Sequence, residues 1–395
     1  METRPRLLLV GGGHANVALL KAARRWTRQG ARITLLTPGR YLWYSGMSPE
    51  YVGGVYAAEA ARIDLLRLCL VNGAAFVPGR AVSVDTAART VGTVTGEHLP
   101  YDLAVFDVGG LPADGERADG AVRVKPLSEL RRLVAWLDES GGGHLVVVGG
   151  GAAGVEVLLN ATARVRGHPG FGFTLLEPGP RLLGHFAPGL GELAGRRLRE
   201  RGVDVRLNAR AGQVEEGGVR LMGDERVPAD LVLWATGTRG QAWLGGSGLP
   251  VDGKDRLCVT RTLQVPGHPR GLGAGDAVSV AGLDLDPSGV NAVKEGLHLR
   301  GQVGRLLRAL SLGQAPEDVR LRPFRPYPAS PYLVSTGTPE GWIALGPHLW
   351  SRGRGWLLLK HLADRVWMSR YHAPGEQQEQ SVASQTQAEA AGQAG

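Results

Sequence analysis

Two copies of one glycine-rich signature constrain this chain of 395 residues more than any other feature. The first spans Leu7–Val17 and the second spans Leu145–Glu156, and in each a short apolar run enters a glycine turn and then a helical pattern. This order is typical of the start of a dinucleotide-binding unit. Glycine is needed because the backbone passes in contact with a pyrophosphate and the helix amides must face it unobstructed. Two such units predict that one chain holds two dinucleotides, and they suggest electron transfer between them.

Size and composition are those of an ordinary globular protein. With 43% hydrophobic and 21% charged residues, the chain is long enough for two or three domains with full cores. The net charge of +8 permits weak attraction to anionic membranes or cofactors. The sequence contains no basic run with interleaved aromatic residues, so we expect no nucleic-acid partner.

The two cysteines, Cys69 and Cys258, stand far apart in the sequence. This spacing excludes a local redox dithiol and a cysteine-ligated metal site, so we expect both to pack as small apolar residues and no metal to be bound. The N-terminus runs directly into the first expected strand, and no apolar stretch approaches about 18 residues, so we expect neither a signal peptide nor a spanning helix. The sequence therefore predicts a cytoplasmic protein, and it leaves open peripheral contact with the inner face of the cell membrane.

Similar elements follow the two glycine turns. In the first unit we expect a strand over 6–11, a helix over 15–28, a second strand over 32–37 and a closing strand over 103–109. The matching strands of the second unit are expected at 145–149, 173–177 and 231–237. The two units are thus a weak internal repeat at the scale of a domain.

Three further segments complete the chain. Gly275-Asp276 precedes a helix expected over 288–310, and the Pro-, Tyr- and Trp-containing region after Pro323 predicts a small C-terminal domain of strands and one helix. Residues 373–395 are rich in Gln, Ala, Ser and Glu and lack aromatic residues, so we expect them to be disordered.

The ordered series of these motifs resembles the pyridine nucleotide-disulphide oxidoreductase superfamily, and within it the type II NADH dehydrogenase branch, which lacks the dithiol. Two segments, Ile33–Met47 and Trp356–Tyr371, are similar to a subgroup found fused or adjacent to selenide, water dikinase. The resemblance covers about residues 6–372 and implies an α/β fold. It comprises two Rossmann-like dinucleotide-binding domains, with the FAD domain interrupted by the NAD domain, and a small α+β C-terminal domain.

The resemblance also implies the bounds of these domains. The FAD domain would take residues 1–112 and 240–310, and the NAD(P)H domain would take residues 113–239. The C-terminal domain would take residues 311–372, and the disordered tail would take residues 373–395.

The first glycine turn and the segments after it form the expected FAD site. Asn16 stands where the fingerprint has its third glycine, and its side chain should push the helix slightly away from the strand. Thr37 stands where an acidic residue usually binds the adenosine ribose, so a hydroxyl replaces a charged acceptor. Asp276 is expected to accept a hydrogen bond from a ribityl hydroxyl, and the helix that begins near Gly289 is expected to stabilise the reduced flavin with its N-terminal amides. The predicted FAD-binding residues are Gly11, Gly12, Gly13, His14, Ala15, Thr37, Tyr44, Ser45, Gly46, Val82, Gly109, Gly275, Asp276, Gly289 and Val290.

The loop Tyr44–Met47 allows two interpretations. In relatives it lies along the flavin ring, which a glycine at position 46 would allow the backbone to approach. The alternative is a surface turn with a packed tyrosine.

The second glycine turn matches the complete fingerprint and forms the expected NADH site. Glu177 ends the paired strand, where a carboxylate accepts hydrogen bonds from both ribose hydroxyls and repels a 2′-phosphate, so we expect NADH to be preferred over NADPH. Arg181 is close enough in sequence to weaken that preference. The predicted NADH-binding residues are Gly149, Gly151, Gly154, Glu177 and Gly237.

One candidate catalytic residue emerges from the resemblance. Glu156 matches a glutamate that approaches the nicotinamide and flavin in type II dehydrogenases, where it could relay a proton or position the carboxamide. A simple glutamate on a helix surface is the alternative. Few catalytic side chains are expected in any case, because hydride transfer between the cofactors is their own chemistry.

The last expected helix carries an apolar stripe of Leu358, Leu359, Leu362 and Val366, which Trp367 could extend. An amphipathic basic helix of this kind can lie on a membrane surface. A helix that packs the same stripe on the protein core has the same pattern, so both interpretations stay open.

These observations predict an FAD-dependent NADH oxidoreductase that passes electrons to a non-thiol acceptor, most plausibly a quinone. The glutamine-rich signature that type II dehydrogenases place at the quinone pocket is absent from Val290–Gly296. One alternative is an NAD(P)H-dependent reductase of another small acceptor, linked to selenium or sulfur. Another is a non-catalytic FAD/NAD-binding redox sensor. The sequence does not fix the oligomeric state.

Overall fold

The computed structural model describes residues 4–113, 115–285, 287–326 and 331–371. The chain divides into two compact units. Among the described residues, unit 1 comprises those within 4–42, 63–111 and 238–326, and unit 2 comprises those within 43–62, 112–237 and 331–371. The tail expected to be disordered, residues 373–395, lies outside the described residues.

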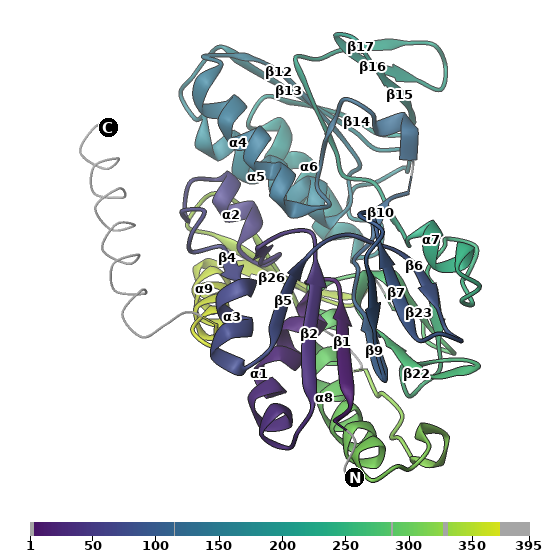
Figure 1. The fold of residues 1–395 in the computed structure, drawn as a ribbon. Coiled ribbons are helices and arrows are strands. Elements are labelled where there is room, and N and C mark those ends of the chain that lie inside the picture. The colour runs from purple at the N-terminus through teal and green to yellow at the C-terminus, as the bar shows by residue number, and fades with distance from the viewer. Residues whose placement is uncertain (1–3, 114, 286, 327–330, 372–395) are drawn as a thin grey trace. The chain divides into compact units, whose positions relative to one another are not determined.

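Unit 1 is built on a six-stranded sheet in the order β21-β22-β9-β1-β2-β5 (Figure 1). All neighbours pair in parallel except β21 and β22. The central strand β1 is almost wholly buried, which explains its uninterrupted apolar sequence. The strands are β1 (Arg6–Val10), β2 (Arg32–Thr37), β5 (Ala75–Pro78), β9 (Leu103–Phe106), β21 (Gln264–Val265) and β22 (His268–Gly273).

Two long helices of unit 1, α1 (His14–Arg28) and α8 (Gly289–Ser311), pack closely against each other. A Cβ at Gly296 of α8 would lie 2.6 Å from Ala15 Cα, so glycine is required where α8 meets the first turn of α1. The bounds of α8 confirm the helix predicted over 288–310. The remaining elements of unit 1 are α3 (Leu65–Asn72), α7 (Ala242–Gly246), β6 (Ala81–Asp85), β7 (Thr90–Thr93), β8 (His98–Pro100), β20 (Leu257–Val259), β23 (Val278–Val280), η3 (Gly275–Ala277) and η4 (Pro316–Asp318).

Unit 2 repeats the plan with a five-stranded parallel sheet in the order β11-β18-β12-β13-β14. The strands are β11 (Val122–Arg123), β12 (Gly143–Val148), β13 (Phe171–Leu176), β14 (Val203–Arg206) and β18 (Leu231–Trp234). The helices beside them are α2 (Ser48–Val52), α4 (Leu130–Glu139), α5 (Ala152–Arg164) and α6 (Pro188–Arg199). A hairpin sheet, β15 (Ala211–Glu215), β16 (Gly218–Leu221) and β17 (Arg226–Pro228), completes this part.

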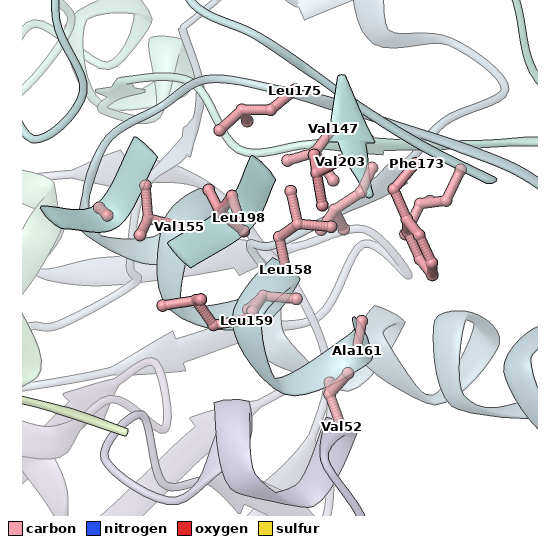
Figure 2. Packing of buried hydrophobic residues seen from close by; sticks show 14 of the residues in the cluster. Val52, Val147, Val155, Leu158, Leu159, Ala161, Phe173, Leu175, Leu198 and Val203 are labelled. Atoms are coloured by element: carbon pink, nitrogen blue, oxygen red, sulfur yellow. The ribbon is translucent and has the colours of Figure 1, made fainter. Parts of the chain in front are cut away.

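The core of unit 2 lies between this sheet and its helices (Figure 2). Leu158 and Leu159 of α5 are fully buried in it, and Val147 and Leu175 of the sheet belong to the same cluster. Val52 of α2 also belongs to it, because α2 packs on α5. The short segment 43–62 is thus part of the core of unit 2.

The C-terminal part of unit 2 is an antiparallel sheet of β24 (Pro331–Ser335), β25 (Gly341–Leu345) and β26 (Leu349–Gly353), followed by α9 (Arg354–Met368). In α9, Lys360 and Asp364 are buried, whereas Leu358 and Leu362 are 65% and 56% exposed. The helix therefore turns charged residues inward and its apolar stripe outward.

The chain passes between the units through β3 (Tyr41–Trp43) and β4 (Arg62–Asp64), and through β10 (Leu111–Pro112) and β19 (Thr238–Arg239). The remaining short helices are η1 (Gly115–Ala118) and η2 (Leu127–Glu129). No helix in the described part of the chain has both the length and the apolar character needed to cross a bilayer. The prediction of an α/β fold with two Rossmann-like parallel sheets is confirmed.

Candidate functional site

The first glycine turn follows β1 directly and is closely packed. Gly11 has φ +91°, and a Cβ there would collide with the backbone of Asp107 at the end of β9. A Cβ at Gly12 would lie 2.9 Å from Thr37 Oγ1 at the end of β2. Gly13 is the N-cap residue of α1. The turn therefore sits at the carboxyl ends of three neighbouring strands, where dinucleotides bind in such sheets.

The amides of this turn can hold a phosphate. Within the described residues, the amides of Gly12 and Gly13 have no hydrogen-bond partner, and the first turn of α1 contains no acidic residue. His14 is the first residue of α1 and is 9% exposed. Unbonded amides at a helix N-terminus attract anions. The geometry fits the pyrophosphate of a dinucleotide.

Asn16 and Asp107 make the first turn different from the second. The side-chain amide of Asn16 donates to the carbonyls of Val10, Gly11 and Val105 at 2.8–3.3 Å. Asp107 Oδ2 accepts hydrogen bonds from the amides of Ala15 at 2.8 Å and Asn16 at 3.0 Å. Hydrogen bonds thus join α1 to β1 and β9 at this position. The sequence predicted only that the Asn16 side chain would displace the helix from the strand.

The second turn places Gly154 and Ala235 at the matching positions. A Cβ added at Gly154 would collide with Gly149 O, and it would lie 3.3 Å from the Cβ of Ala235. In unit 2, two small residues therefore allow α5 to pack closely against the strand ends. In unit 1, the hydrogen-bonded Asn16 and Asp107 stand at the matching positions.

Two buried acids beside the first turn were not predicted. Burial raises the pKa of Asp107 to about 7, and the charge of Asp276 adds to this effect. Burial likewise raises the pKa of Glu295, to about 8, although its Oε2 accepts a hydrogen bond from Gly275 N at 2.6 Å. Asp107 could not be recognised from the sequence, because only the tertiary fold brings it to the amides of Ala15 and Asn16.

The other predicted FAD residues of unit 1 lie on different elements. Asp276 lies in η3, whose first residue, Gly275, has φ +75° and would collide with Asp107 if it carried a Cβ. Gly289 and Val290 open α8, where Ser288 Oγ caps the helix by accepting from Asn291 N at 3.3 Å.

Two other predicted FAD-binding residues, Val82 and Gly109, have fewer protein atoms around them. Val82 is 39% exposed on β6. It lies three residues beyond Gly79, whose amide donates to Thr37 O at 3.0 Å at the end of β2. Gly109, with φ +69°, follows β9, and a Cβ added there would have nothing within 4 Å.

The second turn lies in unit 2 between β12 and α5. Gly149 has φ +110° and would meet Ala235 O at 2.6 Å with a Cβ. A Cβ at Gly151, the N-cap residue of α5, would have nothing within 4 Å. The amide of Gly151 has no partner among the described residues, so this turn also offers unbonded amides to a phosphate.

Glu177 lies at the end of β13 beside this turn. Its Oε2 accepts from Gly150 N and its Oε1 from Gly179 N, both at 2.7 Å. Arg181 donates instead to the carbonyls of Gly184 and Phe186. The carboxylate is therefore held by backbone amides, while the guanidinium binds backbone carbonyls. The predicted Gly237 is exposed after β18.

Glu156 is buried in α5, so its interpretation as a residue on the helix surface is wrong. It is 4% exposed and accepts from Ser335 N at 2.8 Å, Ser335 Oγ at 3.0 Å and Tyr332 hydroxyl at 3.2 Å. Burial raises its pKa to about 7, and the nearby charge of Lys360 opposes that rise. A carboxyl with this pKa can bind or release a proton near neutral pH.

A buried ionic cluster lies near Glu156, formed by Glu50, Lys360 and Asp364, with His361 at its edge. Lys360 Nζ donates to Glu50 Oε2 at 2.6 Å, Asp364 Oδ2 at 2.8 Å and Gly46 O at 2.5 Å. Burial lowers the pKa of Lys360, but Asp364 and Glu50 outweigh burial and raise it. The sequence did not predict this cluster, because the pattern of α9 places its charged residues away from the apolar stripe that a helix normally packs.

The cluster also explains the loop Tyr44–Met47. A Cβ at Gly46 would lie 2.7 Å from Asp364 Oδ1, so glycine is required there by α9. Tyr44 stacks on Trp367, with ring centroids 6.1 Å apart. Ser45 lies between them in sequence and is half-buried. The packed tyrosine of the alternative interpretation is therefore present.

The two cysteines lie in unit 1 as free thiols. Cys69 is buried and Cys258 is half-buried. Burial raises the pKa of Cys69 to about 12. Cys69 is therefore an inert thiol that packs as a small apolar residue.

The parallel sheets and the two glycine turns define a protein with two dinucleotide-binding folds. The chain belongs to the pyridine nucleotide-disulphide oxidoreductase family, whose model matches residues 5–296. It is therefore an enzyme of an NADH-dependent flavoprotein oxidoreductase family, as predicted.

Known proteins are similar over most of the chain. A NADH dehydrogenase-like protein of Mycobacterium tuberculosis is 27% identical over 313 residues, which cover 74% of this chain and 77% of the relative. A type II NADH:quinone oxidoreductase of the same organism is 26% identical over 324 residues, covering 71% and 67%. The structure of NDH2 from Plasmodium falciparum with NADH superposes with a TM-score of 0.78 at 14% identity, covering 94% and 95%. This last likeness concerns the fold.

Proposed function

We propose that the protein transfers a hydride from NADH to FAD and electrons onward to a quinone. The observation that supports this most is the pair of glycine turns, each with unbonded amides at a helix N-terminus. Relatives named as NADH:quinone oxidoreductases support the choice of acceptor. FAD, when bound, supplies the chemistry that accepts a hydride and delivers electrons.

We propose that FAD binds to unit 1 and NADH to unit 2. The FAD domain would then take residues 1–112 and 240–310, the NADH domain residues 113–239, and the C-terminal domain residues 311–372. In unit 1 the amides of Gly12 and Gly13 hold the pyrophosphate, Thr37 binds the adenosine ribose and Asp276 binds the ribityl chain. In unit 2 the first turn of α5 holds the NADH pyrophosphate and Glu177 binds the ribose.

Glu156 is proposed as the catalytic residue, which holds or releases a proton near the nicotinamide. Its burial and its three hydrogen bonds fix the carboxyl group in one orientation. A fixed carboxyl whose pKa lies near neutral pH suits a general acid or base.

An absorbance spectrum tests the proposed function. We expect the purified protein to carry about one non-covalent FAD per chain, and the flavin band to bleach with NADH under nitrogen and to return with a quinone. Asp276→Ala should retain less FAD, because a ribityl hydroxyl loses its acceptor, whereas Asp318→Ala, an exposed change in η4, should not. A wild type that binds no supplied flavin would contradict the FAD site. Bleaching without reoxidation by quinones would point to another acceptor, and a flavin that NADH does not bleach would point to a redox sensor.

The coenzyme preference can be changed at Glu177. We expect the wild type to favour NADH over NADPH in kcat/KM, and Glu177→Gln to narrow the ratio by roughly tenfold because charge repulsion of a 2′-phosphate is lost. Glu192→Gln, an exposed change on α6, serves as the control. If the wild type used NADH and NADPH with equal kcat/KM, the proposal that Glu177 excludes the 2′-phosphate would be wrong.

We also propose that α9 attaches the protein to a membrane surface. Leu358, Leu359, Leu362 and Val366 are 44–65% exposed, and exposed arginines lie along the same helix at positions 354 and 365. Apolar side chains flanked by basic ones are typical of helices that lie on anionic lipid.

Substitution tests this attachment better than truncation, because truncation would also remove the buried Lys360. Leu358→Gln with Leu362→Gln should abolish co-sedimentation with anionic vesicles, since each leucine loses roughly 1.5–3 kcal/mol of burial. The melting temperature should stay unchanged, because both side chains are exposed. Met222→Gln, 60% exposed elsewhere in unit 2, is the matched control. An intact protein that does not bind vesicles would end this proposal.

A further inference from the structure

A run of hydrogen-bonded titratable groups leads inward through unit 2 from His361. The His361 side chain is 23% exposed, and its Nε2 lies 2.6 Å from Glu50 Oε1. Glu50 Oε2 lies 2.6 Å from Lys360 Nζ, which lies 2.8 Å from Asp364 Oδ2. The Tyr44 hydroxyl is hydrogen-bonded to Asp364 at the other end. These five residues are called the His361–Tyr44 relay below.

The inner members of the relay are shielded from solvent. The side chains of Glu50, Lys360 and Asp364 are 2%, 5% and 6% exposed. A buried ion pair seldom stabilises a protein more than apolar packing would, so stability gives a weak reason for this arrangement. A continuous path from a partly exposed imidazole to buried oxygens suits proton transfer.

Reduction of a quinone to a quinol requires such a path. The overall reaction converts NADH, a quinone and one proton to NAD⁺ and a quinol. The hydride of NADH carries both electrons and one proton, so the second proton comes from the solvent in every turnover.

We propose that the His361–Tyr44 relay takes up this second proton and delivers it at the loop Tyr44–Met47, an inference that rests on the proposed function. The His361 ring binds a solvent proton at Nδ1, and the proton on Nε2 passes to Glu50 Oε1. The Glu50 carboxyl turns its proton toward Lys360, Lys360 Nζ releases one of its protons to Asp364 Oδ2, and the lone pair left on Nζ then takes up the proton of Glu50, so the lysine regains its charge in each turnover. Asp364 passes the proton on through the Tyr44 hydroxyl.

The pKa shifts of the two carboxyl groups favour proton transfer from Glu50 to Asp364, whereas the raised pKa of Lys360 opposes release of the proton between them. Burial raises the pKa of Glu50, but His361 and Lys360 reverse the shift, so its pKa is lowered and it holds a proton only briefly. Burial dominates at Asp364 and raises its pKa despite Lys360. The groups around His361 are Glu50, the Tyr56 ring, which meets it edge to face with the ring centroids 5.9 Å apart, and Arg365, whose Nε donates to the His361 carbonyl.

The first experiment separates this proposal from the proposed function. Bleaching of bound FAD by NADH and its return with a water-soluble quinone are followed separately by stopped flow. We expect His361→Ala to bleach at the wild-type rate and to reoxidise about 10²-fold more slowly. His168→Ala, an exposed histidine after α5, should match the wild type in both steps. A wild type without bleaching or reoxidation contradicts the proposed function, whereas unchanged reoxidation in His361→Ala overturns the relay alone.

Two further measurements exclude a purely structural role. Added imidazole should restore at least a tenth of the lost reoxidation rate in His361→Ala, because it can replace the missing proton carrier. Asp364→Asn keeps an oxygen for Lys360, which stays paired with Glu50, but it cannot hold a proton, so it should slow reoxidation in a protein that is still folded and melts above Lys360→Met. Failure of imidazole to restore the rate would overturn the relay.

A readout independent of turnover is the side-chain NMR signal of His361. The short contact to Glu50 predicts a strongly downfield Nε2–H resonance in the wild type that is lost in Glu50→Gln. A spectrum in which Glu50→Gln leaves this resonance unchanged would overturn the role of Glu50.

Discussion

Replacing Lys360 by methionine is expected to lower the melting temperature by roughly 6–20 °C. The substitution leaves Glu50 and Asp364 buried without their cation, and breaking a buried ion pair costs about 3–5 kcal/mol. Thermal melting followed by circular dichroism measures the change. Lys254→Met, an exposed change in unit 1, is the control and should leave the melting temperature unaffected.

A triple variant tests the cause of this loss. Lys360→Met combined with Glu50→Gln and Asp364→Asn removes all three charges and should recover much of the lost stability, because no unpaired charge stays buried. Equal melting of Lys360→Met and the wild type would contradict the buried cluster. A triple variant no more stable than the single one would show that the lost hydrogen bonds of the ammonium group, rather than the unpaired charges, cause the loss.

Two alanine substitutions in the second glycine turn are expected to act in different ways. In Gly154→Ala the new Cβ would collide with Gly149 O, so α5 must move from β12, and we expect both a lower melting temperature and a loss of NADH binding of about 10²-fold or more. In Gly151→Ala the Cβ has nothing within 4 Å, so the melting temperature should stay near that of the wild type. NADH binding should still weaken, because the methyl group stands beside the amide that binds the phosphate.

Titration of NADH by fluorescence, together with thermal melting of the same samples, distinguishes the two effects. Gly301→Ala in α8, where the new Cβ would also have nothing within 4 Å, is the control for an added methyl group. Undiminished NADH affinity in Gly151→Ala would refute the assignment of this turn to the NADH phosphates.

The sequence predicted those parts of the fold that depend on local pattern. The strands at 6–10 and 145–148 are apolar runs before glycine, and the helix over 288–310 has a regular period and a serine cap. Glycine turns are similarly readable, because the backbone conformation at Gly11 and Gly149 requires the residue type. The family resemblance could therefore be read from these segments alone.

The parts that escaped prediction depend on contacts between distant segments. Asp107 meets the amides of Ala15 and Asn16 from 91 or more residues away, and Glu50 meets Lys360 across 310 residues. The residue pattern of α9 did not indicate which side of the helix is buried. An apolar stripe normally marks the buried side of a helix, but here Lys360 and Asp364 lie on the inner side, where Glu50 from segment 43–62 pairs with Lys360.

Asn16 and Asp107 also bear on how the two glycine turns can diverge. A change of Asn16 to glycine alone would remove one donor from each of the carbonyls of Val10, Gly11 and Val105, although Val10 O would keep the Asp107 amide. A change of Asp107 to alanine alone would leave two helix amides without an acceptor. Each single step toward the Gly154 and Ala235 arrangement thus passes through a less stable protein, although the double change leads to a workable turn. Asn16 and Asp107 each become harder to replace because the other is present. Lineages of this protein should therefore gain or lose both residues together.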